Sequence, residues 1–140
     1  MAFINPDGSA LISPEPGSAN AGWTLNAAPA ANTQATATRA AGGAGVRHVC
    51  TSILAILAST TGLAANATGT FVLRDGASGT GTIIWQGQIS IPNAVGQSQW
   101  VSIDSINIVG SYGTAMTAEF TAASGAGTLQ SLSITGYDTN

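Results

Sequence analysis

The clearest structural pattern in the chain is TFVLRDGASGTGTIIWQ, residues 70–86. Two runs rich in Val, Ile, Thr and aromatic residues, 70–74 and 82–86, flank a loop at 75–81 that contains three glycines. β-Branched and aromatic residues are enriched in strands, and glycine reaches the positive φ angles of tight turns at little steric cost. The stretch therefore predicts a β-hairpin closed by a glycine-rich loop.

The same sequence pattern extends on both sides of the hairpin, from Val46 onward. Short apolar runs separated by glycine clusters are typical of consecutive antiparallel strands. The run at 46–59 is apolar on both faces, which fits a helix or a strand by periodicity alone, but its many β-branched residues favour a strand. The expected strands are 46–59, 70–74, 82–86, 88–92, 99–109, 116–122 and 129–137, with a further one at 34–39.

Seven or eight strands at this spacing predict an all-β protein, a jelly-roll-like antiparallel β-sandwich. We expect the runs 116–122 and 129–137 to form the last pair. Within 99–109 the alternation of apolar and polar residues changes phase, which predicts a bulge near Ser105.

The first 45 residues differ in composition from the rest. They contain four of the five prolines and only scattered large apolar residues, so they cannot close a core of their own. We expect an extended N-terminal arm at 1–45 and a β-sandwich domain at 46–140, or from about 34 if the first strand forms there. A disordered tail is the alternative, because disorder concentrates at termini. The isolated apolar residues favour an arm that docks on a neighbour, and the candidate partner-binding residues in it are Phe3, Ile4, Leu11, Ile12, Trp23 and Leu25.

The three tryptophans are the first candidates for interface residues, since Trp is enriched at binding hot spots. For Trp85 and Trp100 we favour burial in the domain's own core. Trp23 precedes the predicted domain and should lie outside that core.

Arg74-Asp75-Gly76 is the most defined charged feature of the sequence. Asp75 can cap its own turn through a side-chain to backbone hydrogen bond. Arg74 is a further candidate partner-binding residue, because it could pair with a carboxylate of a neighbouring subunit. Closing the hairpin is the favoured role for Arg74.

Charged residues make up only 6% of the chain, with three arginines and no lysine. Nucleic-acid binding is disfavoured, because neutralising several phosphates requires clustered basic residues. The longest apolar run, 53–58, is far shorter than the roughly 20 residues of a membrane-spanning helix. A free protein normally keeps a charged surface for solubility, so this composition suits a protein covered by partners.

Enzymatic chemistry is not expected. His48 and Cys50 would project to one face of a strand and are the one catalytic-looking pair, yet their neighbours are core-like, and a buried cysteine usually behaves as a small hydrophobe. One cysteine and one histidine are too few for a structural zinc site. We therefore predict no catalytic residues, no metal and no cofactor.

Four segments resemble small structural proteins encoded near the head genes of tailed bacteriophages: 49–53 (VCTSI), 73–85 (LRDGASGTGTIIW), 116–120 (MTAEF) and 133–137 (SITGY). The resemblance covers roughly residues 46–138, and the Arg-Asp-Gly hairpin is its most specific part. It implies a capsid cement or decoration protein, with a jelly-roll domain bound outside the capsid.

The expected function is that of a structural virion protein on the outer surface of the capsid, which links adjacent major capsid protein subunits and stabilises the shell. The expected partners are the major capsid protein and a second copy of this chain, with a homodimer favoured over a trimer. No nucleic acid and no membrane are expected as partners. The alternative is a tail-associated receptor- or carbohydrate-binding module.

Overall fold

The computed structural model describes residues 22–63 and 65–140. These residues form nine strands. The strands are β1 (Gly22–Ala27), β2 (Thr36–Arg39), β3 (Arg47–Ser59), β4 (Ala67–Asp75), β5 (Thr82–Ile91), β6 (Ser98–Ile103), β7 (Ile108–Val109), β8 (Met116–Phe120) and β9 (Thr128–Thr139).

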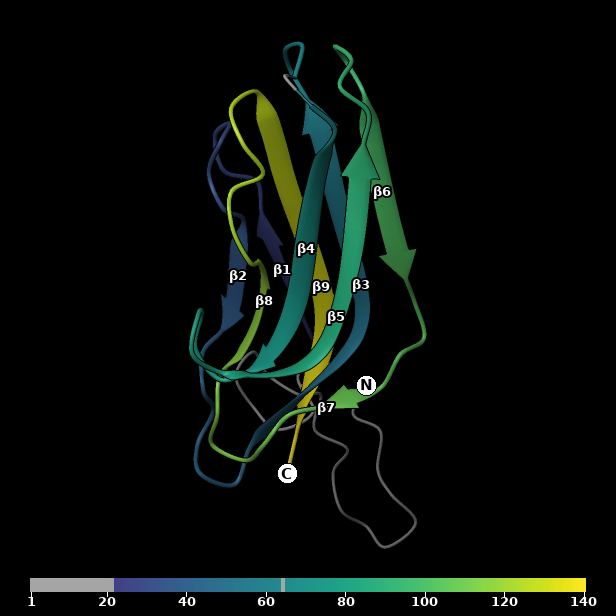
Figure 1. Ribbon diagram of the computed structural model, residues 1–140. Coiled ribbons are helices and arrows are strands. Elements are labelled where there is room, and N and C mark those ends of the chain that lie inside the picture. Colours follow the sequence, from purple (N-terminus) through teal and green to yellow (C-terminus); the bar gives the residue numbers. More distant parts are fainter. Residues whose placement is uncertain (1–21, 64) are drawn as a thin grey trace, which may run out of the picture.

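The strands form two antiparallel sheets packed face to face (Figure 1). One sheet has the order β1-β9-β3-β6, with β7 also paired to β3, and the other has the order β2-β8-β4-β5. The early strands pair with the late ones in reverse order: β1 with β9, β2 with β8, β3 with β6 and β7, and β4 with β5. This is the double-sheet pairing of a jelly roll, and the predicted fold class is confirmed.

The hairpin predicted from residues 70–86 is formed by β4 and β5. Its loop has positive φ angles at Gly76 (127°) and Gly79 (74°), as the glycine pattern predicts. At Gly81 a Cβ atom would lie 2.8 Å from the Cα of Gly76, so the two ends of the loop approach too closely for a side chain. Glycine therefore allows both the positive φ angles of this turn and the close approach of the two ends of the loop.

The long strand β3 changes phase at a β-bulge, and beyond it apolar residues occupy both the core-facing and the outward positions. A β-bulge interrupts its pairing with β9 between Cys50 and Ser52. His48 and Cys50 face the interior before the bulge, and Ile53, Ala55 and Leu57 face it afterwards. The extra residue moves the side chains that face the other sheet from even to odd positions.

The core lies between the sheets and consists mainly of β-branched, aliphatic and aromatic side chains. Phe71 of β4 is at its centre, with ring centroids 5.4 Å from Trp85 and 5.8 Å from Phe120. The buried members are Trp23, Ala35, Cys50, Ile53, Ala55, Leu57, Ala67, Phe71, Leu73, Ile89, Ile91, Met116, Ala118, Phe120, Leu132 and Ile134. Trp85 packs against this cluster, as predicted.

The expected boundary at residue 45 does not match the sheets. β1 pairs with β9 along its whole length, and β2 pairs with β8, so the sandwich already includes residues from Gly22 onward. No local pattern predicts β1, because its two large apolar residues, Trp23 and Leu25, stand in an alanine-rich context. Residues 1–21 lie outside the described residues.

Two further expectations about strands are wrong. Residues 88–91 continue β5 instead of forming a separate strand, because the pairing with β4 runs unbroken past Gly87, where the ring of Phe71 occupies the space of a side chain. β8 and β9 are not a pair, since they belong to different sheets. In addition, the single strand expected at 99–109 with a bulge near Ser105 is divided into β6 and β7, with a break between them and Ser105 at φ 59°.

Candidate docking surface

Two carboxylate side chains, those of Asp138 and Glu119, are buried. Asp138 of β9 is 1% exposed. It accepts hydrogen bonds from the indole Nε1 of Trp23 at 2.8 Å and from Arg39 at 2.5 Å, and its Oδ1 lies 2.7 Å from Nδ1 of His48. Burial alone would raise the pKa of Asp138, but the hydrogen bonds and charges of Arg39 and His48 outweigh it and lower that pKa. This cluster joins β1, β3 and β9 of one sheet to β2 of the other.

Glu119 of β8 is also 1% exposed, although it faces outward from its sheet. The β4–β5 loop covers it: Ser78 and the backbone N–H of Gly79 donate to its carboxylate, and Nε of Arg74 donates at 2.5 Å. Burial again acts to raise the pKa, and these donors lower it overall. Arg74 also donates to the carbonyl of Gly81 at 2.9 Å, which closes the hairpin as the sequence reading favoured.

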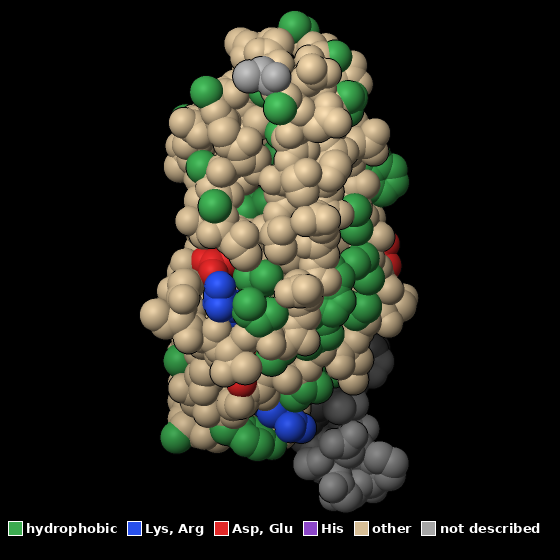
Figure 2. Space-filling view, in the orientation of Figure 1, with side chains coloured by type: hydrophobic (Ala, Val, Ile, Leu, Met, Phe, Trp, Pro, Cys, Tyr) green, Lys and Arg blue, Asp and Glu red, His purple; other side chains and the backbone are tan. Residues whose placement is uncertain are grey.

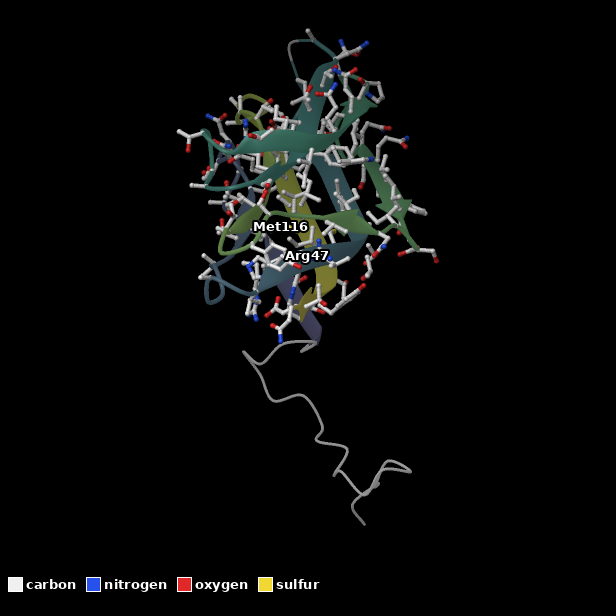
Figure 3. All side chains as sticks on the ribbon, turned by 90° about the horizontal axis from the view of Figure 1, so that it is seen from below. Arg47 and Met116 are labelled. Atoms are coloured by element: carbon white, nitrogen blue, oxygen red, sulfur yellow. The ribbon has the colours of Figure 1, made fainter. Side chains whose placement is uncertain are left out.

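Arg47, at the start of β3, forms no ion pair with another described residue. Its guanidinium lies over the ring of Tyr112, 4.9 Å from the centroid. Arg47 is at the end of the sandwich where the start of β8, marked by Met116, also lies (Figure 3). Arg39 and Arg74 are paired with the buried carboxylates of Asp138 and Glu119, so few unpaired charges remain among the surface residues that the structure describes. The face in Figure 2 consists mostly of uncharged polar and hydrophobic atoms.

One face of the molecule combines this lack of charge with an exposed tryptophan. On β3, Leu54, Ile56 and Ala58 point away from the core and are half-buried. The register places Trp100 of β6 directly opposite Ile56. Trp100 is 65% exposed, and a solvent-facing Trp of this kind offers a large apolar contact area.

We call this surface the Trp100 face. It is defined by the outward side chains over the middle of the β1-β9-β3-β6 sheet: Asn26, Leu54, Ile56, Ala58, Ser98, Trp100, Ser102, Leu129, Ser131 and Ser133. No member of the set is charged. An apolar centre with small hydroxyl groups around it is a surface that another protein can cover without burying an unpaired ion.

A shallow hollow of about 220 Å³ lies within the Trp100 face. Its walls come from three neighbouring strands and the residues just after β1: Asn26, Ala27, Ala28, Leu54, Ile56, Ser131, Leu132 and Ser133. Ile56 lines the hollow and is also the cross-strand partner of Trp100, so Trp100 is on the strand next to the hollow.

The neighbouring edge of the sandwich is also uncharged. β5 and β6 are edge strands of the two sheets, and they lie side by side in Figure 1. The stretch 82–103, which includes both strands, has no charged residue. It contributes Ile83, Val95 and Trp100 to the exposed large hydrophobics. Free proteins usually protect such edges with charged residues or proline within the strand.

The candidate site residues from the sequence are distributed differently from expectation. The expectation that Trp23 lies outside the core is wrong, because Trp23 is 8% exposed and its indole faces Asp138. Leu25 packs partly against the core. Phe3, Ile4, Leu11 and Ile12 lie outside the described residues.

The expectation for Trp100 is wrong in the opposite sense, since it is exposed and not part of the core. The signal was present in the sequence. Val101 and Ile103 alternate with polar residues and face the interior, so the residue between Gln99 and Val101 must face outward.

The His48–Cys50 pair does not form an open reactive site. Both residues are buried, and burial raises the pKa of the Cys50 thiol to about 11. The thiol donates to the carbonyl of Ser52, while the ring nitrogens of His48 face Asp138 and the carbonyl of Ala40. Within residues 22–63 and 65–140 there is no group of three metal-ligating side chains, and no helix is long and apolar enough to cross a membrane.

No protein-family model and no curated protein sequence matches the chain. Among solved structures, the chain is similar to that of Desmodium yellow mottle tymovirus, with 12% identity, 91% of this chain and 93% of the other covered, and a TM-score of 0.40. It is similar to the coat protein of tobacco streak virus, with 11% identity, coverages of 78% and 89%, and a TM-score of 0.30.

A third similar structure is the arabinose-bound α-L-arabinofuranosidase MgGH51, with 10% identity and a TM-score of 0.42. The match covers 82% of this chain but spans only 19% of that enzyme. The assignment of the fold rests on the pairing of the strands described above.

Proposed function

We propose that this protein is a structural component of a tailed-phage virion that binds the outside of the capsid and cements adjacent major capsid protein subunits. The observation that carries the proposal is the Trp100 face, an uncharged surface with a tryptophan that is 65% exposed. Charged residues make up only 6% of the chain, and two of the carboxylates are buried. Such a surface is suited to permanent cover by protein. The bacteriophage resemblance of residues 46–138 supports the same function.

The chemistry of the surface determines how attachment would work. The exposed Trp100 and the half-buried Ile56 and Leu54 provide apolar area at the centre of a contact, and tryptophan at such a position is commonly a hot spot. The surrounding serine hydroxyls can hydrogen-bond to a partner backbone. A lasting contact buries at least about 1,000 Å² in total, more than the Trp100 residue alone provides, so neighbouring surfaces and residues 1–21 would take part.

The proposal includes a second copy of this chain as partner, with a homodimer favoured. The resemblance to the cement protein of a short-tailed Bordetella phage favours a position that bridges capsid subunits. Several weak contacts linked in one molecule hold together better than separate ones, because each raises the effective concentration for the next.

The test is to add purified protein to mature shells that lack it, and to measure occupancy and the temperature at which the shells open. Saturable binding with a higher opening temperature supports the proposal. Shells that bind no protein, or bind it with no change in opening temperature, contradict it.

A second candidate function is a tail-associated receptor- or carbohydrate-binding module. Trp100 itself favours it, because an exposed aromatic ring with hydroxyl groups on the same side of its strand, here Ser98 and Ser102, can stack on a sugar while these groups bind its hydroxyls. A glycan array that gives saturable binding, lost in Trp100→Ala, would establish this function in place of the first.

A further inference from the structure

The hollow in the Trp100 face is shaped to receive aliphatic side chains. Leu54, Ile56 and Leu132 provide apolar walls, and its volume is about 220 Å³. An apolar protein cavity of about 150 Å³ accommodates benzene, so there is room for a branched aliphatic side chain with its neighbour. Asn26, Ser131 and Ser133 stand at the same hollow and can hydrogen-bond to the backbone of an extended segment.

A segment of the required chemistry precedes β1. Residues 1–21 contain two adjacent pairs of large apolar residues, Phe3-Ile4 and Leu11-Ile12. Leu11-Ile12 is wholly aliphatic, like the apolar walls of the hollow, whereas Phe3-Ile4 includes an aromatic ring. Leu11-Ile12 is flanked by Ala10 and Ser13, which are small and uncharged, and no side chain lining the hollow is charged.

The position of β1 indicates which molecule supplies this segment. The chain enters the sheet at Gly22, opposite Tyr137, whereas the hollow is at the far end of β1, beside Asn26 and Ala27. From Ala27 to Gly22, β1 runs away from the hollow of its own copy. Ile12 precedes Gly22 by ten residues, which gives a reach of roughly 33–36 Å when extended, enough to extend beyond the end of the sandwich to another molecule.

We propose that Leu11 and Ile12 of one copy dock in the hollow beside Trp100 of a second copy. Each copy then has both a donor segment, Leu11-Ile12, and an acceptor hollow. Copies associate through these segments as well as through the sandwich. This inference rests on the proposed function in that it names a contact between cement molecules. It concerns free protein in solution, so it can be tested without shells.

The test uses disulfide trapping between differently tagged full-length variants, Leu11→Cys and Ser133→Cys. The control acceptor is Ser90→Cys, which is exposed on the outer face of the other sheet. The native Cys50 is buried with its pKa raised to about 11, so it does not compete for coupling.

Under mild oxidation, Leu11→Cys should link to Ser133→Cys at least ten times faster than to Ser90→Cys. Equal rates for the two acceptors would overturn the proposal. So would a Leu11→Cys/Ser133→Cys double variant that links within one chain instead of between chains.

A second measurement does not depend on cysteine chemistry. Sedimentation velocity should show self-association at least ten-fold weaker in Leu11→Ser/Ile12→Ser than in the matched variant Phe3→Ser/Ile4→Ser. Equal self-association of the two variants would contradict docking by Leu11 and Ile12. Because shell binding is measured separately, a failure here leaves the result of the shell experiment intact.

Discussion

The indole N–H of Trp23 donates to the carboxylate of Asp138 at 2.8 Å, across a sequence separation of 115 residues. This bond connects the first described strand to the last and is buried. The same carboxylate accepts from Arg39, on the opposite sheet. Trp23 therefore helps to fix the edge strand β1 to the sandwich.

Replacing Trp23 by Phe should destabilise the fold while keeping an aromatic ring in place. The buried Asp138 carboxylate loses one donor, and the loss of a hydrogen bond to a charged group costs about 1.5–3 kcal/mol. Urea unfolding followed by circular dichroism measures the change. Trp100→Phe is the matched control and should unfold within about 0.5 kcal/mol of wild type, as exposed positions do.

Stability should fall in acid because both buried carboxylates have lowered pKa values. A carboxylate whose folded pKa lies below its unfolded pKa contributes stability above the unfolded pKa, and that stability is lost as the pH falls through the folded pKa. The free energy of unfolding should therefore decrease as the pH is lowered from about 5. In Glu119→Gln the decrease should be shallower. The surface variant Asp104→Asn should keep the wild-type slope, and identical slopes in all three proteins would refute the assignment.

The Arg74–Glu119 pair should determine the order of the β4–β5 loop. Removing the Arg74 side chain with Arg74→Ala leaves a buried carboxylate without its cation, and breaking a buried pair costs about 3–5 kcal/mol. Hydrogen exchange at the amide of Gly79, which donates to Glu119, should accelerate strongly. Unchanged protection of that amide would show that the loop does not depend on the pair.

Trp100→Ala should weaken binding to shells without affecting the fold. A hot-spot tryptophan contributes about 2 kcal/mol or more, which corresponds to a roughly 30-fold weaker affinity. Val95→Ala is the comparison, since Val95 is 66% exposed but lies outside the Trp100 face. If occupancy is the same for both variants, the Trp100 face is not the contact.

Attachment to shells should change little between low and moderate salt. Salt screens contacts between exposed charges, and the Trp100 face has none. Occupancy measured at 50 and 500 mM NaCl should agree within about two-fold. Release of the protein in moderate salt would show that ionic contacts dominate.

How far the sequence predicts this molecule depends on where each signal comes from. The β4–β5 hairpin was predictable because its strands and its glycine turn are neighbours in sequence. β1 was not, because Trp23 and Leu25 become buried only when β9 is beside them, and no local pattern specifies that partner. Trp100 was expected in the core from its residue type, although its alternation with Val101 indicates that it faces outward. The ionic clusters of Asp138 and Glu119 join distant segments and became visible only in the fold.

The reverse-order pairing of the strands has a consequence for the way the protein folds. β9 is the last strand along the chain, yet it lies between β1 and β3 in the interior of its sheet. Non-local pairings of this kind close large loops before any contact compensates for the lost entropy, so such topologies fold slowly. Until β9 is in place, the apolar edges of β1 and β3 stay open to association with other chains. The amount of correctly assembled protein should therefore depend on temperature and concentration during synthesis more than on the stability of the finished sandwich.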